Sequence, residues 1–172
     1  IIPPLDTTTE YENVVDIPDV AEREYTINMP IYSCVHKVYI GIKEGCVLKP
    51  ADDYKITKPI VFYGSSITQG GCASRPGNTY PSQISRALDC DFISFGLAGS
   101  AKGEEEIARY ISSLDMTAFC YDYDYNADSL AQYKETHENF FKIIRAAQPN
   151  LPIIMTTRPK KHLTDEEKER IN

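Results

Sequence analysis

Residues 59–71 read Pro-Ile-Val-Phe-Tyr-Gly-Ser-Ser-Ile-Thr-Gln-Gly-Gly. Residues 60–63 form a short, uninterrupted apolar run, which is typical of a strand buried on both faces of a parallel sheet. The run breaks at Gly64 into glycines and hydroxyl residues. Ligands bind at the carboxyl ends of strands in open parallel sheets, so this stretch predicts a buried strand followed by a functional loop.

The same alternation continues downstream, with further apolar runs at 92–95, 118–121 and 153–156. The segments between them have helical character. Pro81 suits a first helical turn, acidic residues at 104–106 open the next helix, and the longest helix is expected from about Asp128. A last helix is predicted by the capping-box pattern Thr164-Asp-Glu-Glu167. This order predicts an α/β fold with a doubly wound, mainly parallel sheet flanked by helices.

The region before Lys58 has a different pattern. Short runs of β character occupy 24–29 and 35–42, separated by Gly, Pro and Asp, and no helical period is visible. We expect roughly three strands here, which is near the lower limit for independent stability. The chain is therefore predicted to divide into a strand-and-turn region, 1–57, and an α/β domain, 58–172.

Charge and composition exclude several classes of function. The 18 basic and 25 acidic side chains give a net charge of -7, whereas a nucleic-acid-binding protein needs a basic face. No run of about 18 apolar residues is present, so no membrane span is predicted. The five cysteines are scattered without a C-x-x-C pair, which argues against a zinc site and a disulfide framework. They are interpreted as buried free thiols, which slightly favours the cytoplasm over secretion and leaves the compartment open.

Both ends of the chain are expected to be truncated. Residues 1–4 are Ile-Ile-Pro-Pro, without an initiator Met or the features of a signal peptide. At the other end, the helix predicted after Thr164 has room for fewer residues than the average of about 11–12.

The loop after the first strand carries two hydroxyls, those of Ser65 and Ser66, between glycines. A serine on such a turn, with free main-chain N–H groups nearby, is the setting that an acyl-transfer nucleophile needs. The alternative is a glycine-rich turn whose serines cap a helix. The loop does not match a nucleotide-binding P-loop, because Gly70 and Gly71 are followed by Cys72 rather than lysine.

Two further loops belong to the same predicted edge. Residues 96–100 contain two glycines three apart, which suit either a tight turn or a main-chain donor to a developing negative charge. Residues 122–128 alternate Asp and Asn, but Ala127 and Tyr133 stand where an EF-hand needs Gly and Glu. Asn126 is better interpreted as an amide donor at the crevice.

These loops together resemble a known family. Residues 59–77 are similar to the first block of SGNH (GDSL-like) hydrolases, in the group that carries an N-terminal β-sandwich domain. Residues 96–99 resemble the second block, 123–127 resemble the third, and 24–42 resemble the closing strands of the sandwich. The resemblance implies a flavodoxin-like SGNH hydrolase domain over 58–172, lacking its C-terminal part, after a partial β-sandwich-like region over 1–57.

The resemblance also implies a function and its residues. Ser66 matches the nucleophile, and its own N–H, the Gly99 N–H and the Asn126 side-chain amide match the oxyanion donors. The implied activity is hydrolysis of short acyl, acetyl-type esters of a carbohydrate or lipid through a serine acyl-enzyme, without a metal or other cofactor. The partner would be a small-molecule ester, an acylated carbohydrate among the options, and homo-oligomerisation through exposed strand edges stays open.

The chain departs from the family pattern in two places. Ser65 stands where the first block usually has Asp, and the final D-x-x-H block, which would supply the general base, is absent and expected beyond residue 172. His36 is interpreted as a half-buried strand residue, His137 as a packing residue, and His162 as a poor candidate for the base. The alternative hypotheses are a catalytically silent fragment or carbohydrate- or acyl-binding module, and an acyltransferase that uses the same Ser66.

Overall fold

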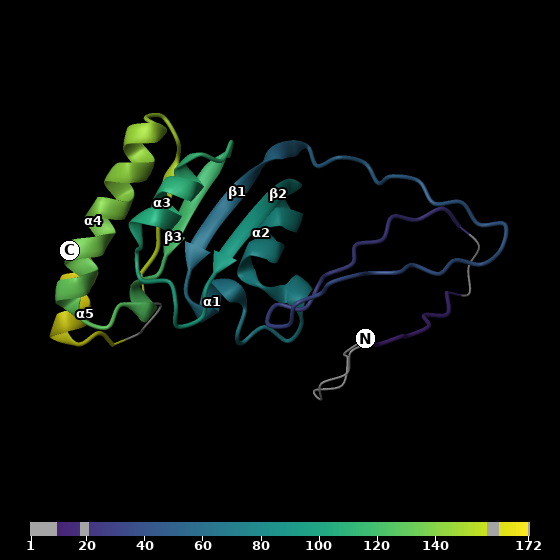
Figure 1. The fold of residues 1–172 in the computed structure, drawn as a ribbon, viewed down its shortest axis with the longest axis horizontal. Helices are drawn as coiled ribbons and strands as arrows, with labels where there is room; N and C mark the ends of the chain where they lie inside the picture. The colour runs from purple at the N-terminus through teal and green to yellow at the C-terminus, as the bar shows by residue number, and fades with distance from the viewer. Residues whose placement is uncertain (1–9, 18–20, 158–161, 172) are drawn as a thin grey trace.

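The computed structural model describes residues 10–17, 21–157 and 162–171, and its centre is a parallel sheet (Figure 1). The strands are β1 (Ile56–Gly64), β2 (Cys90–Gly96), β3 (Ala118–Asp122) and β4 (Ile153–Met155). They lie in the order β2-β1-β3-β4, and every described pairing is parallel. Each of the predicted apolar runs forms one of these strands, so the predicted α/β fold is confirmed.

Helices cover both faces of the sheet, as Figure 1 shows. Their bounds are α1 (Ser66–Gln69), α2 (Tyr80–Leu88), α3 (Glu105–Ser112), α4 (Leu130–Ala147) and α5 (Asp165–Ile171), with short 3-10 turns η1 (Pro76–Asn78) and η2 (Asp124–Asn126). The side chains of β1 alternate between two apolar cores. Val61 and Tyr63 pack with α3 and α4, whereas Ile60 and Phe62 pack with α2.

The caps of the helices follow their sequences closely. Thr164 and Glu167 exchange the reciprocal main-chain bonds of a capping box, at 3.2 and 3.0 Å, so that prediction is confirmed. The longest helix begins at Leu130 rather than near Asp128, because the Ser129 side chain caps it by accepting the N–H of Gln132.

The strand order creates a topological switch point beside β1. The chain passes from β1 to the neighbour on one side, β2, and then returns across β1 to β3 on the other side. The loops that leave β1 and β3 therefore diverge, and the crevice between them is where open α/β sheets bind ligands. The strand order therefore places the loops that begin at Ser65 and Tyr123 on the two sides of the switch point.

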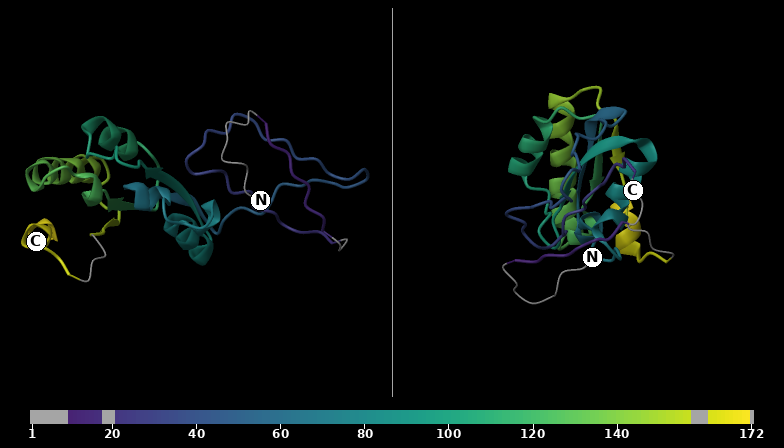
Figure 2. Two further views of the ribbon diagram at one scale, coloured as in Figure 1. Left: turned by 90° about the horizontal axis from the view of Figure 1, so that it is seen from below. Right: turned by 90° about the vertical axis from the view of Figure 1, so that its right-hand side faces the viewer.

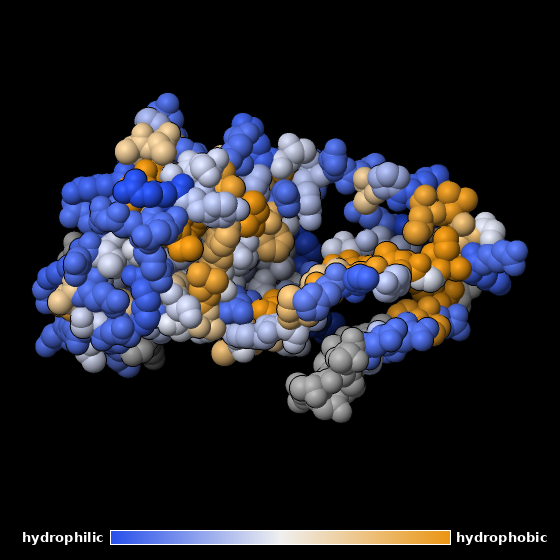
Figure 3. Space-filling view, viewed as in Figure 1, coloured by the Kyte–Doolittle hydropathy of each residue, from blue (hydrophilic) through white to orange (hydrophobic). Residues whose placement is uncertain are grey.

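The N-terminal region differs from the sequence expectation. Residues 10–17 and 21–55 contain no strand, and most of this segment projects away from the sheet, beyond α2 (Figures 1 and 2). The strands expected over 24–29 and 35–42 are not formed, because a strand needs a hydrogen-bonded neighbour and the described residues offer them none. Apolar side chains stay at the surface here, as Figure 3 shows, with Tyr39 83% exposed. A β-sandwich over 1–57, and the division at residue 57, stay predictions.

The cysteines divide into two groups. Cys90 and Cys120 are buried free thiols as expected, whereas the interpretation is wrong for Cys34, Cys46 and Cys72, which are exposed. Burial raises the pKa of the Cys120 thiol to about 11. Within the described part of the chain, no helix is both long and apolar enough to cross a membrane.

Candidate active site

The two serines after β1 have different surroundings. Ser65 is fully buried, and its hydroxyl accepts the N–H of Ile67 at 3.2 Å, which makes it the N-cap of α1. Ser66 is the first residue of α1 and is partly exposed. The capping interpretation is therefore correct for Ser65, and Ser66 is the serine that carries an accessible side chain.

Helix α1 packs directly on the ends of β1 and β2. A Cβ atom on Gly64 would lie 2.0 Å from the Thr68 hydroxyl oxygen, and one on Gly96 would lie 2.2 Å from the main-chain nitrogen of Gln69. Only glycine permits this close approach. The glycine at each strand end thus allows α1 to sit at the edge of the sheet.

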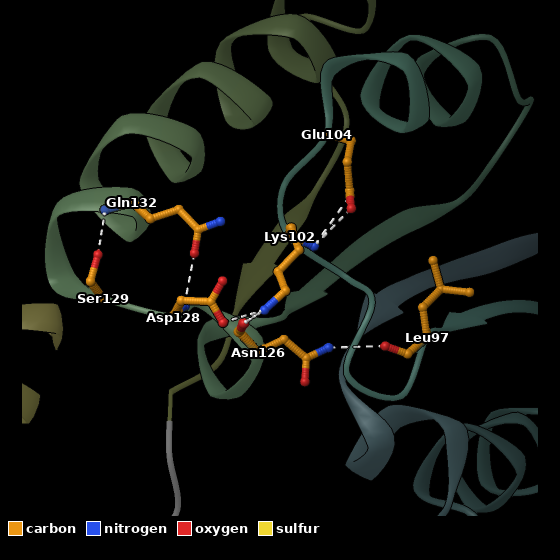
Figure 4. A network of polar contacts seen from close by, with 7 residues as sticks. All are labelled: Leu97, Lys102, Glu104, Asn126, Asp128, Ser129 and Gln132. Carbon is orange, nitrogen blue, oxygen red and sulfur yellow. Dashed lines mark hydrogen bonds and ion pairs between the residues drawn. The ribbon is translucent and has the colours of Figure 1, made fainter.

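Main-chain and side-chain hydrogen bonds join the three predicted loops. Leu97 donates its N–H to the carbonyl of Gly64 at 2.9 Å, and Ser65 donates its N–H to the carbonyl of Asp122 at 3.1 Å. The Asn126 amide then donates to the carbonyl of Leu97 at 2.9 Å (Figure 4). The structure therefore brings the loops that carry Ser66, Gly99 and Asn126 together at one edge of the sheet.

The N–H of Gly99 is distinct from those of its neighbours. The other N–H groups of residues 97–101 all have acceptors, namely Gly64 O, the Gln69 side chain, and Leu97 O twice. Among the described residues the Gly99 N–H has no acceptor, and the same holds for the Ser66 N–H. Gly99 also has a φ of 70°, a left-handed conformation that favours glycine and turns this peptide differently from a regular strand end.

A buried polar cluster lies beneath the serine loop. Asp122 ends β3 with only 8% of its surface exposed, and its carboxylate accepts hydrogen bonds from the Thr68 hydroxyl and the Tyr80 phenol, both at 3.3 Å. Burial raises the pKa of Asp122, and its hydroxyl partners oppose that shift. The cluster joins β3 to α1 and α2, so it fixes the position of the short helix that carries Ser66.

A second network holds the Asn126 loop (Figure 4). Lys102 donates from its ammonium group to the main-chain oxygen of Asn126 at 2.5 Å and to Asp128 Oδ1 at 2.6 Å. The sequence did not point to Lys102, because a single lysine in a loop looks the same in sequence whether it makes a structural contact or faces solvent.

The histidines do not complete a triad within the described residues. The His137 ring stacks on Tyr121 and packs against Tyr133, each with centroids 4.6 Å apart, and burial lowers the pKa of His137. This is the predicted packing role. His36 is exposed rather than half-buried, since the strand expected around it is not formed, and His162 is exposed beside residues that the structure does not describe.

A cavity of about 460 Å³ borders helix α1 at Thr68 and Gln69 and extends between the N-terminal segment, at Met29, and residues of α2 and β2 such as Ser85 and Phe92. Ser66, Gly99 and Asn126 are not among its lining residues. No cluster of acidic, His or Cys side chains suited to a metal ion occurs in residues 10–17, 21–157 and 162–171.

Comparisons with known proteins agree with this geometry. Residues 57–170 match the sequence model of the GDSL-like lipase/acylhydrolase family. A candidate GDSL-like lipase from Bacteroides ovatus is 35% identical, with a TM-score of 0.58 over 67% of this chain and 35% of that one. The salicylyl-acyltransferase SsfX3 of a tetracycline biosynthetic pathway shares the fold at 22% identity, with a TM-score of 0.61 over 76% of this chain and 41% of that one. The chain thus spans less than half of either structure, and comparison with curated proteins finds no match.

Proposed function

Because the chain belongs to the GDSL-like lipase/acylhydrolase family, we propose that it supplies the nucleophile and the oxyanion hole of a serine esterase. Ser66 is the proposed nucleophile. The proposed oxyanion donors are its own N–H, the Gly99 N–H and the Asn126 side-chain amide. The proposed substrate is a short acyl ester, of the acetyl type, on a carbohydrate or lipid.

The observation that carries the proposal is the pair of main-chain N–H groups that lack an acceptor among the described residues, at Ser66 and Gly99. Ser66 is the first residue of α1, where a helix leaves its N–H groups without an intrahelical acceptor, and Gly99 lies in an exposed turn, so both N–H groups can donate to a bound carbonyl oxygen. Loops joined by hydrogen bonds hold this pair and Asn126, which uses one of its two amide hydrogens on Leu97. Donors fixed in advance are what stabilise the charge that develops on a carbonyl oxygen during acyl transfer.

In the proposed reaction, the Ser66 oxygen attacks the ester carbonyl carbon while a general base accepts the hydroxyl proton. The carbonyl oxygen becomes an oxyanion that accepts hydrogen bonds from the three donors. The C–O bond to the alcohol then breaks, and the alcohol leaves with that proton. Water attacks the acyl-enzyme in the same way and releases the acid.

The base in this proposal is a histidine of the family's final D-x-x-H block. Residues 1–172 contain no such motif. The test is therefore hydrolysis of p-nitrophenyl acetate by the full-length protein. Ser66→Ala should abolish turnover, and Asn126→Ala should lower kcat by about 10²–10³-fold, as removal of other oxyanion donors does. Full turnover by a folded Ser66→Ala variant would overturn the proposal.

The absent motif also supports a second candidate, in which residues 1–172 alone are catalytically silent and at most bind a carbohydrate or acyl group. Comparison of residues 1–172 with the full-length protein in the same assay separates the two. Ser66-dependent hydrolysis by residues 1–172 alone would remove this candidate and direct attention to His162. A further assay with an added alcohol distinguishes hydrolysis, which releases the free acid, from acyl transfer, which forms an ester of that alcohol.

A further inference from the structure

Lys102 lies on the loop between β2 and α3 and reaches the loop that follows β3. Its ammonium group donates to the main-chain oxygen of Asn126 at 2.5 Å and pairs with Asp128 Oδ1 at 2.6 Å. We propose that Lys102 is a positioning residue for the oxyanion hole, which holds Asn126 in register with the Gly99 loop. This inference rests on the proposed function and deepens it.

The base of Lys102 is itself firmly anchored. Its N–H lies 3.2 Å from both carboxylate oxygens of Glu104, and that carboxylate accepts the Tyr63 phenol at 2.8 Å. The Tyr63 oxygen in turn accepts the N–H of Gly103 at 2.8 Å. Tyr63 is fully buried in β1, the strand that ends one residue before Ser65. Lys102 is therefore attached to the same strand that positions the nucleophile.

Asn126 is held on two sides by the segment that contains Gly99. Its side-chain amide donates to Leu97 at one end of that segment, and its main-chain oxygen accepts from Lys102 at the other end. Figure 4 shows these two contacts on opposite sides of Asn126. Without the lysine, the side-chain hydrogen bond to Leu97 is the one hydrogen bond among the described residues that would join Asn126 to this segment. That same side chain must also face the substrate.

The electrostatic surroundings favour positioning over simple stabilisation. The Lys102 side chain is 29% exposed, whereas Asp128 is 74% exposed. An exposed ion pair contributes little to stability. We therefore expect the half-buried contact between Lys102 and the Asn126 oxygen, rather than the ion pair with Asp128, to hold the Asn126 loop in place. The chain offers a matched control in Lys58 and Asp115, an exposed ion pair of 2.9 Å far from these loops.

The test compares Lys102→Met with Lys58→Met in the full-length protein, on p-nitrophenyl acetate. We expect Lys102→Met to lower kcat by about 10- to 100-fold with KM nearly unchanged, since small misplacements of a catalytic group have effects of this order. Lys58→Met should match the wild type. Asp128→Asn should keep most of kcat, because the contact between Lys102 and the Asn126 oxygen remains.

A double-mutant cycle separates positioning from general damage. In an Asn126→Ala background the donor is gone, so Lys102→Met should lower kcat no further. If it lowers kcat equally in both backgrounds, or if Lys102→Met keeps the wild-type kcat while Ser66→Ala is inactive, the inference is wrong. Full activity of Ser66→Ala would instead remove the proposed function. If Lys102→Met does not fold, Lys102→Gln replaces it. Glutamine carries a neutral donor on a shorter side chain, and we expect the same fall in kcat with KM nearly unchanged.

Discussion

The Thr68 hydroxyl donates a 3.3 Å hydrogen bond to the Asp122 carboxylate, and this contact ties the four-residue helix α1 to the end of β3. Both residues are buried, Thr68 with 1% and Asp122 with 8% of its surface exposed. A helix this short has no stability of its own. Its position, and with it that of Ser66, therefore depends on contacts such as this one.

The first prediction concerns Asp122 and pH. Burial raises the pKa of Asp122 above 3.8, so the folded protein keeps this proton at pH values where the unfolded chain has lost it. The contribution of Asp122 to stability is therefore complete below pH 3.8, and it is lost as the pH rises through the pKa that Asp122 has in the folded protein. Asp122→Asn removes this loss, while its amide oxygen can still accept the Thr68 hydroxyl.

Urea unfolding between about pH 4 and about pH 7 measures this difference. The free energy of unfolding of the wild type should fall relative to that of Asp122→Asn as the pH rises across this range. All other titrating groups are common to both proteins and cancel in the comparison. Parallel curves for the two proteins would show that the carboxyl titrates alike in the folded and unfolded states.

The second prediction separates the two serines. Ser65→Ala removes the N-cap of α1 and should lower the free energy of unfolding by about 1 kcal/mol, while kcat stays within about threefold of the wild type. Ser129→Ala, which removes the cap of α4, is the matched control and should have a similar effect on stability. A folded Ser65→Ala variant without esterase activity would instead make Ser65 the reactive serine.

The third prediction compares two glycines of the second loop. A Cβ on Gly96 would lie 2.2 Å from the main-chain nitrogen of Gln69, whereas a Cβ on Gly99 would meet no atom within 4 Å. Gly96→Ala must displace α1 from the sheet, so we expect a large loss of stability and of activity. Gly99→Ala retains its N–H and has only its φ of 70° to oppose it, which costs roughly 1–2 kcal/mol.

Thermal unfolding of both variants tests this order, with activity measured on whatever protein stays folded. Gly41→Ala is a suitable control, because a Cβ added at Gly41 would meet no atom within 4 Å and the φ of this residue is not left-handed. Equal losses for Gly96→Ala and Gly99→Ala would mean that α1 does not require close contact with β2.

The sheet was predictable because buried parallel strands must be apolar on both faces, and the runs at 60–63 and 118–121 satisfy this rule. Helix α1 was predicted only as one of two alternatives, a turn whose serines cap a helix, since four residues are too few to show a helical period. The contacts of Lys102 depend on two loops that lie 24 residues apart in the sequence, and only the folded chain brings them together. The strands expected over 24–42 depend on neighbours, which no local pattern can supply.

The last prediction uses His137, whose ring is enclosed by aromatic side chains including Tyr121 and Tyr133. Burial lowers the pKa of His137 below 6.5, so the unfolded chain binds a proton more readily than the folded protein does. The contribution of His137 to stability is complete above pH 6.5, and it is lost as the pH falls through the pKa that His137 has in the folded protein. His137→Phe keeps a ring in the stack and cannot titrate. Between about pH 7.5 and about pH 5.5 it should therefore lose less stability than the wild type.

Chemical unfolding at both pH values gives the comparison, and His36→Gln serves as the control because His36 is exposed. If the curves of His137→Phe and the wild type coincided, the imidazole of His137 would be as accessible to protons in the folded protein as in the unfolded chain. His137 would then no longer be confined to a packing role, and it would return to the histidines that merit a test as the base for Ser66.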